Sequence, residues 1–382
     1  MERSKFYSPP KLKHDLLPIV GMAKLPPHYG SLPEDQEKVL AEYLADNAEA
    51  LKLLHQAASM KDCRFPTDLT KGASVLLKHL GSIRQAERLL RLELIQALDQ
   101  KHAEQAAQTT IDSLGVARSM SHEPVIISYF VQCVCQEFAV ENLGRTASTI
   151  PLTNMQLLQL SSAFREEGNW QSLTRAIIGD RCTDGGTFED FRSGKSPLIE
   201  ISSLKNDEDQ NQPFFLVPIY KTSGLLDLDY RAYLDAMDGF VNAAQLPPHQ
   251  SIAAAHEVDA RTRRLPRSRI MTHVFTRVLD RLVVIAARQE AELRNAQTAI
   301  AIERYRLAAS KLPDHLSDLV PTFLPSVPTD PFDGKPLRYK TLTKGYVVYS
   351  VSEDREDNGG TEKNSKGIPY APGTDITFTV ER

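Results

Sequence analysis

Four cysteines are the first residues of this chain whose chemistry would depend on spacing: Cys63, Cys133, Cys135 and Cys182. A structural zinc site needs Cys or His ligands in short, regular pairs, and these positions fit none of those patterns. Cys133 and Cys135 lie two residues apart in a segment of helical character, so their side chains diverge and do not readily share one ion. We therefore expect the cysteines to be buried apolar thiols.

Two short motifs resemble parts of known functional sites. Ser193-Gly-Lys-Ser196 ends like a phosphate-binding loop, but Glu189 stands where that loop needs its first glycine. His256-Glu257 lacks the second histidine of a zinc-binding helix. Isolated histidines such as His55 and His102 fall in expected helices, where we expect them to be surface or core residues. The sequence contains no nucleophile elbow or dinucleotide glycine cluster, so it predicts a protein that is not an enzyme.

The composition is that of an ordinary soluble globular protein. The 382 residues are 41% hydrophobic and 25% charged, and the net charge is −4. This balance offers no surface for a polyanion, so nucleic acid is not an expected partner. The chain contains no apolar run of transmembrane length and no signal peptide.

Helical periodicity dominates the chain after a proline-rich lead-in over residues 1–34. Residues 82–98 and 103–117 predict a helical hairpin, and 125–138 predicts a central buried helix. Thr153 and Gln156 form the signature of a helix start. Residues 180–212, rich in Asp, Gly and Ser, are expected to form a long surface excursion, and further helices follow at 225–244 and 251–263.

The longest predicted element runs from Ile270 to Leu307, where no glycine or proline interrupts the sequence. One helix of that length would be a rod of roughly 57 Å, at about 1.5 Å per residue. A rod so long needs a packing partner along its length, and the upstream helices are the obvious one. We expect this helix to join the two halves of the molecule mechanically.

The C-terminal residues predict a small β structure. Pro313 ends the rod, and prolines at 321, 325, 328 and 331 favour extended and turn conformations. Residues 337–351 read as a β-hairpin turning at 343–345, and 376–380 alternates like a further strand. The predicted fold is therefore mainly α with a small α+β cap: a helical-hairpin array, a long helix and an antiparallel sheet. The expected domains are a lead-in over 1–34, a helical scaffold over 35–262, and the long helix plus cap over 270–382.

The last 85 or so residues resemble the globular cap of the major pseudopilin of type II secretion. The resemblance rests on Ile302–Leu307, Leu319-Val-Pro321, Leu324-Pro325 and above all Asp330-Pro-Phe-Asp-Gly-Lys-Pro-Leu-Arg-Tyr339. The whole chain also resembles uncharacterised bacterial proteins that carry a membrane helix, a helical region and this cap. The membrane-embedded half of a pseudopilin helix does not carry over, because Arg277, Asp280, Arg281 and Arg288 would be costly in a bilayer.

The resemblance also implies a calcium site in the acidic loop after the hairpin. The matching residues are Asp354, Asp357 and Asp375, with Asn358 and nearby carbonyls completing a set of hard oxygen ligands. Ser352 and Arg355 stand where the pseudopilin pattern has glycines, and this difference is expected to restrict the tight turn. Calcium is thus the one cofactor that the sequence suggests.

Three functions remain open from the sequence. The first is a non-catalytic scaffold of the cell envelope or periplasm that binds protein partners, with an N-terminal membrane anchor missing from this chain. The second is a soluble hydrolase whose site is assembled from distant residues. The third is a helical-repeat adaptor in the cytosol, which is the location expected if the chain is complete.

Overall fold

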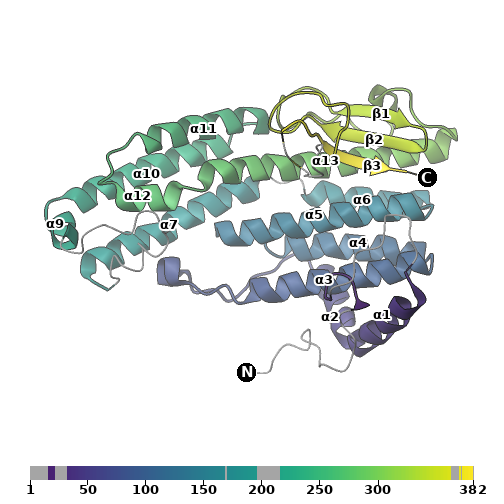
Figure 1. Cartoon of the computed structure of the whole chain (residues 1–382), viewed down its shortest axis with the longest axis horizontal. Helices are drawn as coiled ribbons and strands as arrows, with labels where there is room; N and C mark the ends of the chain where they lie inside the picture. The colour runs from purple at the N-terminus through teal and green to yellow at the C-terminus, as the bar shows by residue number, and fades with distance from the viewer. Residues whose placement is uncertain are drawn as a thin grey trace.

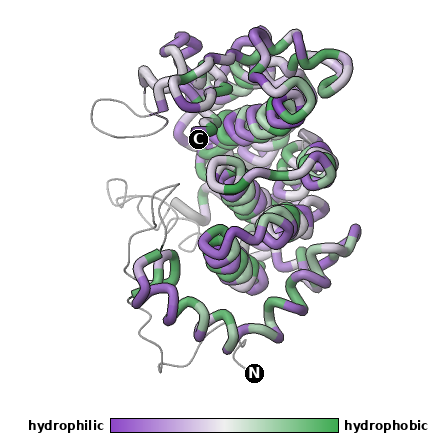
Figure 2. The backbone as a smooth tube through the Cα atoms, turned by 90° about the vertical axis from the view of Figure 1, so that its right-hand side faces the viewer, coloured by the Kyte–Doolittle hydropathy of each residue, from purple (hydrophilic) through white to green (hydrophobic). Residues whose placement is uncertain are grey.

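The computed structural model describes residues 16–21, 32–167, 170–195, 216–362, 370 and 372–381. It is mainly helical, with a three-stranded antiparallel sheet near the C-terminus, which confirms the predicted fold class. The helices are stacked in layers, with the N-terminal helices at one end of the stack and the sheet at the other (Figure 1). Figure 2 shows the same stack along the helix axes.

The first half of the chain forms antiparallel helices. The α3–α4 hairpin and the long buried α5 confirm the predicted elements, and Thr153 and Gln156 form the expected reciprocal bonds at the start of α6 (2.8 Å and 3.3 Å). Most of the lead-in lies outside the described residues. The elements are α1 (Glu34–Asp46), α2 (Ala48–Ala58), η2 (Leu69–Ser74), α3 (His79–Asp99), α4 (Ala103–Arg118), α5 (Ile126–Thr149) and α6 (Asn154–Glu167).

A second group of helices extends the stack away from the first. It contains α7 (Gln171–Ser193), α9 (Leu216–Thr222), α10 (Leu225–Ala244) and α11 (Pro248–Arg263). The predicted bounds of α10 are confirmed.

The prediction of a surface excursion beginning at residue 180 is wrong, because α7 continues to Ser193. Its second half is held by aromatic side chains: the Phe188 ring lies 5.3 Å from that of Tyr233. Gly179 is no helix end, since it leaves room for the Pro124 carbonyl, which a Cβ there would meet at 1.8 Å. Gly194, at φ 79°, ends α7, so the described part of the Ser-Gly-Lys motif is a helix terminus. Ser196 lies outside the described residues.

The single rod predicted over 270–307 is also wrong in its first part. The segment is divided into α12 (Ile270–Thr276) and α13 (Leu279–Ala309), and the two residues between them, Arg277 and Val278, form a turn. The two helices have different packing surfaces: α12 contacts α10 and α11, whereas α13 also contacts α5, α6 and the sheet. The break therefore lies at the point where the packing extends from α10 and α11 to α5, α6 and the sheet.

Asp229 of α10 fixes the start of α12. This carboxylate is fully buried and accepts hydrogen bonds from the backbone N–H groups of Met271 (2.9 Å) and Thr272 (3.1 Å). The Thr272 and Tyr220 hydroxyl groups donate to it as well. A buried carboxylate at a helix N-terminus satisfies free backbone donors and faces the positive end of the helix dipole.

The C-terminal cap lies against α13. It consists of η4 (Leu316–Leu319), β1 (Arg338–Leu342), β2 (Gly345–Ser350) and β3 (Ile376–Val380), in the sheet order β1-β2-β3. Asp330, fully buried, organises the loop before β1, because it accepts bonds from Arg338 (2.5 Å), Val351 N–H (2.9 Å) and the Ser350 hydroxyl (2.8 Å). The Asp-Pro-Phe-Asp-Gly block is therefore held by buried hydrogen bonds.

The cysteines differ from the expectation in part. Cys133 and Cys135 are buried in α5, as predicted, but Cys63 and Cys182 are exposed. Cys63 lies in the irregular segment before η2, and Cys182 lies on the solvent side of α7, which the sequence had assigned to a loop. Within the described residues, no helix combines the length and apolar character needed to cross a membrane.

We predict that Asp229→Ala lowers the free energy of unfolding by about 3 kcal/mol, because it leaves the first-turn N–H groups of α12 buried without an acceptor. Urea unfolding at neutral pH measures the change. Asp235→Ala, at an exposed position of the same helix, is the matched control and should change stability by less than about 0.5 kcal/mol. Equal effects of the two substitutions would show that Asp229 does not anchor α12.

Candidate functional site

The three acidic residues suggested as calcium ligands lie in the loop that follows β2 and in the residues just before β3. Their carboxylates tie the two arms of this loop together through backbone N–H groups. Asp354 accepts from Glu356 (3.1 Å) and Gly373 (2.8 Å), Asp357 from Gly359 (2.9 Å), and Asp375 from Gly360 (2.7 Å) and Thr361 (3.2 Å). Burial, with the nearby charge of Asp357, raises the pKa of Asp375.

The loop makes its tight turns without the glycines of the pseudopilin pattern. Ser352 and Arg355 adopt left-handed backbone conformations, at φ 62° and φ 58°. The side chains at these positions have therefore not prevented the turn, although the left-handed region is strained for residues other than glycine.

The chemistry of these oxygens suits a hard cation, but most of them already accept a hydrogen bond. Among the described residues, no three His, Cys, Asp or Glu side chains are grouped closely enough to hold a metal ion. Residues 363–369 of the same loop are outside the described part. The suggested site remains a prediction.

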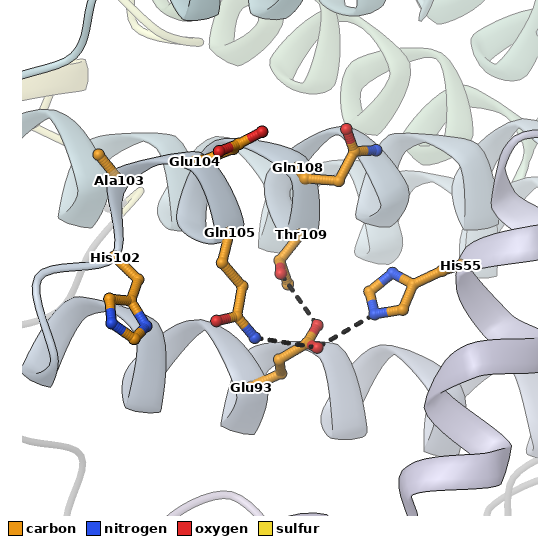
Figure 3. Close-up of a pocket in the computed structure, with 8 residues that line it drawn as sticks. All are labelled: His55, Glu93, His102, Ala103, Glu104, Gln105, Gln108 and Thr109. Carbon is orange, nitrogen blue, oxygen red and sulfur yellow. Dashed lines mark hydrogen bonds and ion pairs between the residues drawn. The ribbon is translucent and has the colours of Figure 1, made fainter.

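A pocket of about 550 Å³ opens between α2, α3 and the first turns of α4 (Figure 3). Its size falls within the range of small-ligand sites. The side chains that line it are polar except for Ala103, and the lining residues are His55, Glu93, His102, Ala103, Glu104, Gln105, Gln108 and Thr109.

His55 joins three helices at the floor of this pocket. It projects from the last turn of α2, and its Nδ1 lies 2.6 Å from Oδ2 of Asp112 on α4. Its Nε2 lies 3.0 Å from Oε1 of Glu93 on α3. Thr109 (2.9 Å) and Gln105 (3.3 Å), both on α4, also donate to Glu93. The cluster thus fastens α2 to the α3–α4 hairpin.

The surroundings of His55 keep it protonated. Its hydrogen bonds to Asp112 and then Glu93 raise its pKa to about 10. Burial by itself would raise the pKa of Glu93, but the hydrogen bond and charge of His55 outweigh that effect, and the pKa of Glu93 is lowered. With both ring nitrogens held by carboxylates, His55 has no free lone pair to act as a general base or metal ligand.

The sequence does not reveal this cluster, because its residues come from three helices and no short motif contains His55 together with Glu93 or Asp112. A signal was present: Gln105, Thr109 and Asp112 recur at helical spacing and place a polar stripe on one face of α4. Nothing in the spacing, however, indicates that Glu93 and His55 approach that stripe from two other helices.

A second group of titratable residues lies on α7, in the part that the sequence had assigned to a loop. Asp180 and Asp184 stand one helical turn apart. Burial raises the pKa of Asp180 to about 6, and burial together with the charge of Asp180 raises the pKa of Asp184 to about 7. Asp180 accepts from the N–H of Ile126 (3.2 Å), and Asp184 accepts from the Tyr233 hydroxyl (3.0 Å). These bonds connect α7 to α5 and α10.

Comparisons with known proteins add no family to this geometry. No family model matches the chain, and no curated protein or solved structure matches it either. The functional argument therefore rests on the residues of this chain.

We predict that His55→Ala lowers the free energy of unfolding by about 2 kcal/mol at pH 7, because two carboxylates then face each other without the cation. The His55 contribution is complete below its ordinary pKa of 6.5 and is lost as the pH rises through about 10. The stability difference between wild type and variant should therefore shrink between pH 7 and pH 10 in urea unfolding.

The control for this experiment is His102→Ala, which removes the other histidine of the same pocket. We expect a change below about 0.5 kcal/mol. A His55 effect that stays constant up to pH 10 would contradict the ion-pair interpretation.

Proposed function

We propose that this protein is a non-catalytic scaffold that binds protein partners in the cell envelope and carries a pseudopilin-like C-terminal cap. The observation that supports the proposal is that ionisable side chains hold parts of the fold together through intramolecular hydrogen bonds. His55, Asp229 and Asp330 are each held by several intramolecular partners, and these partners fasten helices and loops to one another. Groups committed in this way stabilise the structure and are not free for catalysis.

The envelope location is supported by the resemblance of the cap to the pseudopilin family. The residues that carry the resemblance include the Asp330–Pro336 turn, whose buried aspartate accepts hydrogen bonds from Phe332 N–H and from the Ser350 hydroxyl of β2. A helical-repeat adaptor of the cytosol would use the same layered surfaces, so the two proposals differ in location and share the scaffold role.

A hydrolase is the second candidate, and the aspartate pair of α7 is the observation that favours it. Asp180 and Asp184 have pKa values raised to about 6 and about 7, in the range that general acid–base catalysis uses. Their bonds to Ile126 and Tyr233 nevertheless bridge helices, which supports a packing role for both residues.

The scaffold proposal predicts contacts on a limited part of the surface. A photo-crosslinking residue placed at exposed positions on different faces, such as Met60, Met155 and Glu257, should give a discrete adduct on one face only, in cells that make this protein. Excess purified chain without the crosslinker should compete the adduct away. Hydrolysis of chromogenic ester, phosphate or glycoside substrates that Asp184→Asn abolishes, with the fold intact, would instead establish the enzyme.

Calcium is the cofactor that we propose for the cap, held by Asp354, Asp357 and Asp375. Millimolar calcium should raise the melting temperature relative to excess chelator, by an amount equivalent to about 1–2 kcal/mol at ten or more times the dissociation constant. Asp354→Ala should abolish the shift, whereas Asp314→Ala, an exposed acid elsewhere in the cap region, should preserve it. An unchanged melting temperature in wild type would eliminate a calcium site of useful affinity.

A further inference from the structure

The pocket between α2, α3 and α4 carries an excess of negative charge. Glu93 and Glu104 line it, and Asp112 lies directly behind His55. His55 is the counter-charge, and its two carboxylate partners already outnumber it. A ligand that enters this pocket therefore meets a negative potential, which attracts a cation and repels an anion.

The side chains around Glu93 and Asp112 direct their hydrogen-bond donors to these two carboxylates. Both ring nitrogens of His55 face carboxylates, and the Thr109 hydroxyl donates to Glu93. The amide nitrogens of Gln105 and Gln108 donate to Glu93 (3.3 Å) and Asp112 (3.0 Å). These bonds lie within the walls of the pocket and occupy the donors that face Glu93 and Asp112.

Several acceptor atoms remain free beside the ring of His102. With its nitrogen on Glu93, the amide of Gln105 turns its oxygen toward the side of the pocket where His102 lies (Figure 3). Gln108 and Glu104 also line the pocket with an amide oxygen and an exposed carboxylate, and Figure 3 shows both side chains above α4, whereas Gln105 points down toward α3. A ligand that matches these groups must bring N–H donors and a positive charge.

We propose that this pocket binds a lysine or arginine side chain of a protein partner. The inference rests on the scaffold function proposed above and names the partner chemistry at one of its surfaces. A bare metal ion fits less well, because the described residues contain no group of three His, Cys, Asp or Glu side chains placed to ligate one. An ammonium or guanidinium group supplies several donors at once, and the flexible stem carries it from the partner into the pocket.

The test is titration with an acetylated, amidated Gly-Arg-Gly peptide, followed by NMR of the histidine ring signals. We expect the His55 and His102 signals to move together, with a dissociation constant on the order of 1 mM, as befits a ligand of this size. Binding should weaken several-fold when the salt concentration rises from about 0.05 M to 0.5 M. The corresponding Gly-Glu-Gly peptide should leave both signals in place.

A pair of charge-matched variants makes the test specific. Glu104→Gln removes a carboxylate from the rim of the pocket, and Glu42→Gln removes one from an exposed position of α1. Glu104→Gln should weaken peptide binding about fivefold or more, while Glu42→Gln should change it less than twofold. Equal effects of the two variants, equal binding of the acidic peptide, or histidine signals that do not move would each overturn the proposal.

Methylguanidine alone separates a partner side chain from a free small cation. We expect it to bind at least threefold more weakly than the peptide, because it lacks the flanking backbone contacts. If methylguanidine binds as tightly as the peptide, the pocket is a site for a small-molecule cation, and the proposal that it binds a side chain of a protein partner is refuted. The peptide titration and the crosslinking experiment test different claims. A discrete crosslinked adduct without binding of the peptide would refute the cation-binding pocket and would still support the scaffold function.

Discussion

The burial of α13 over most of its length, from Leu282 to Glu303, is the constraint on which the rest of the structure depends. Its sides are covered by α5, α6, α11 and the strands of the cap. Residues with small side chains, such as Ala287, Ala291 and Ala296, are fully buried along it and let these neighbours approach closely. A helix enclosed in this way transmits position from the helical layers to the sheet, because neither side can shift without opening its packing.

Polar side chains on α13 specify how those neighbours sit. Asn295 donates to the carbonyl of Ile376 on β3 (2.8 Å), and Gln297 donates to the carbonyl of Phe164 on α6 (2.8 Å). The Tyr346 hydroxyl of β2 donates in return to the carbonyl of Ala299 (3.2 Å). Burying such groups is favourable only when their partners are in place, so each bond selects one register of cap against helix.

The same principle operates at His55, Asp229 and Asp330, where one buried or half-buried charge collects donors or acceptors from several elements. Each centre makes a different junction: α2 with the α3–α4 hairpin, α10 with α12, and the proline-rich loop with β2. The molecule is thus assembled from apolar layers whose relative placement is decided by a few satisfied charges. The pocket beside His55 is a consequence of one of these junctions, since three helices converge there without closing completely.

The sequence by itself determined the elements whose signals are local. Periodicity and capping residues sufficed for α3, α4, α6 and α10, and the alternating strands and turn residues sufficed for the sheet. Tertiary structure decided the helix boundaries at positions where the local sequence signals and the packing disagreed. The pattern of the sequence indicates a helix end at Gly179, yet this residue lies inside α7. Its lack of a side chain leaves room there for the carbonyl group of Pro124. The segment 270–307 contains no helix breaker, yet it divides at residues 277–278, and only the part after the break also packs on α5, α6 and the sheet.

The candidate site shows the same limit. Helical spacing alone places Gln105, Thr109 and Asp112 on one face of α4, whereas His55 and Glu93 reach that face only when three helices have packed. The charge state of His55, and with it the distinction between a reactive histidine and a structural one, depends on contacts between residues up to 57 positions apart. The spacing of residues along the chain determines which side chains share a face of a helix. The packing of the whole core determines which of these faces come into contact.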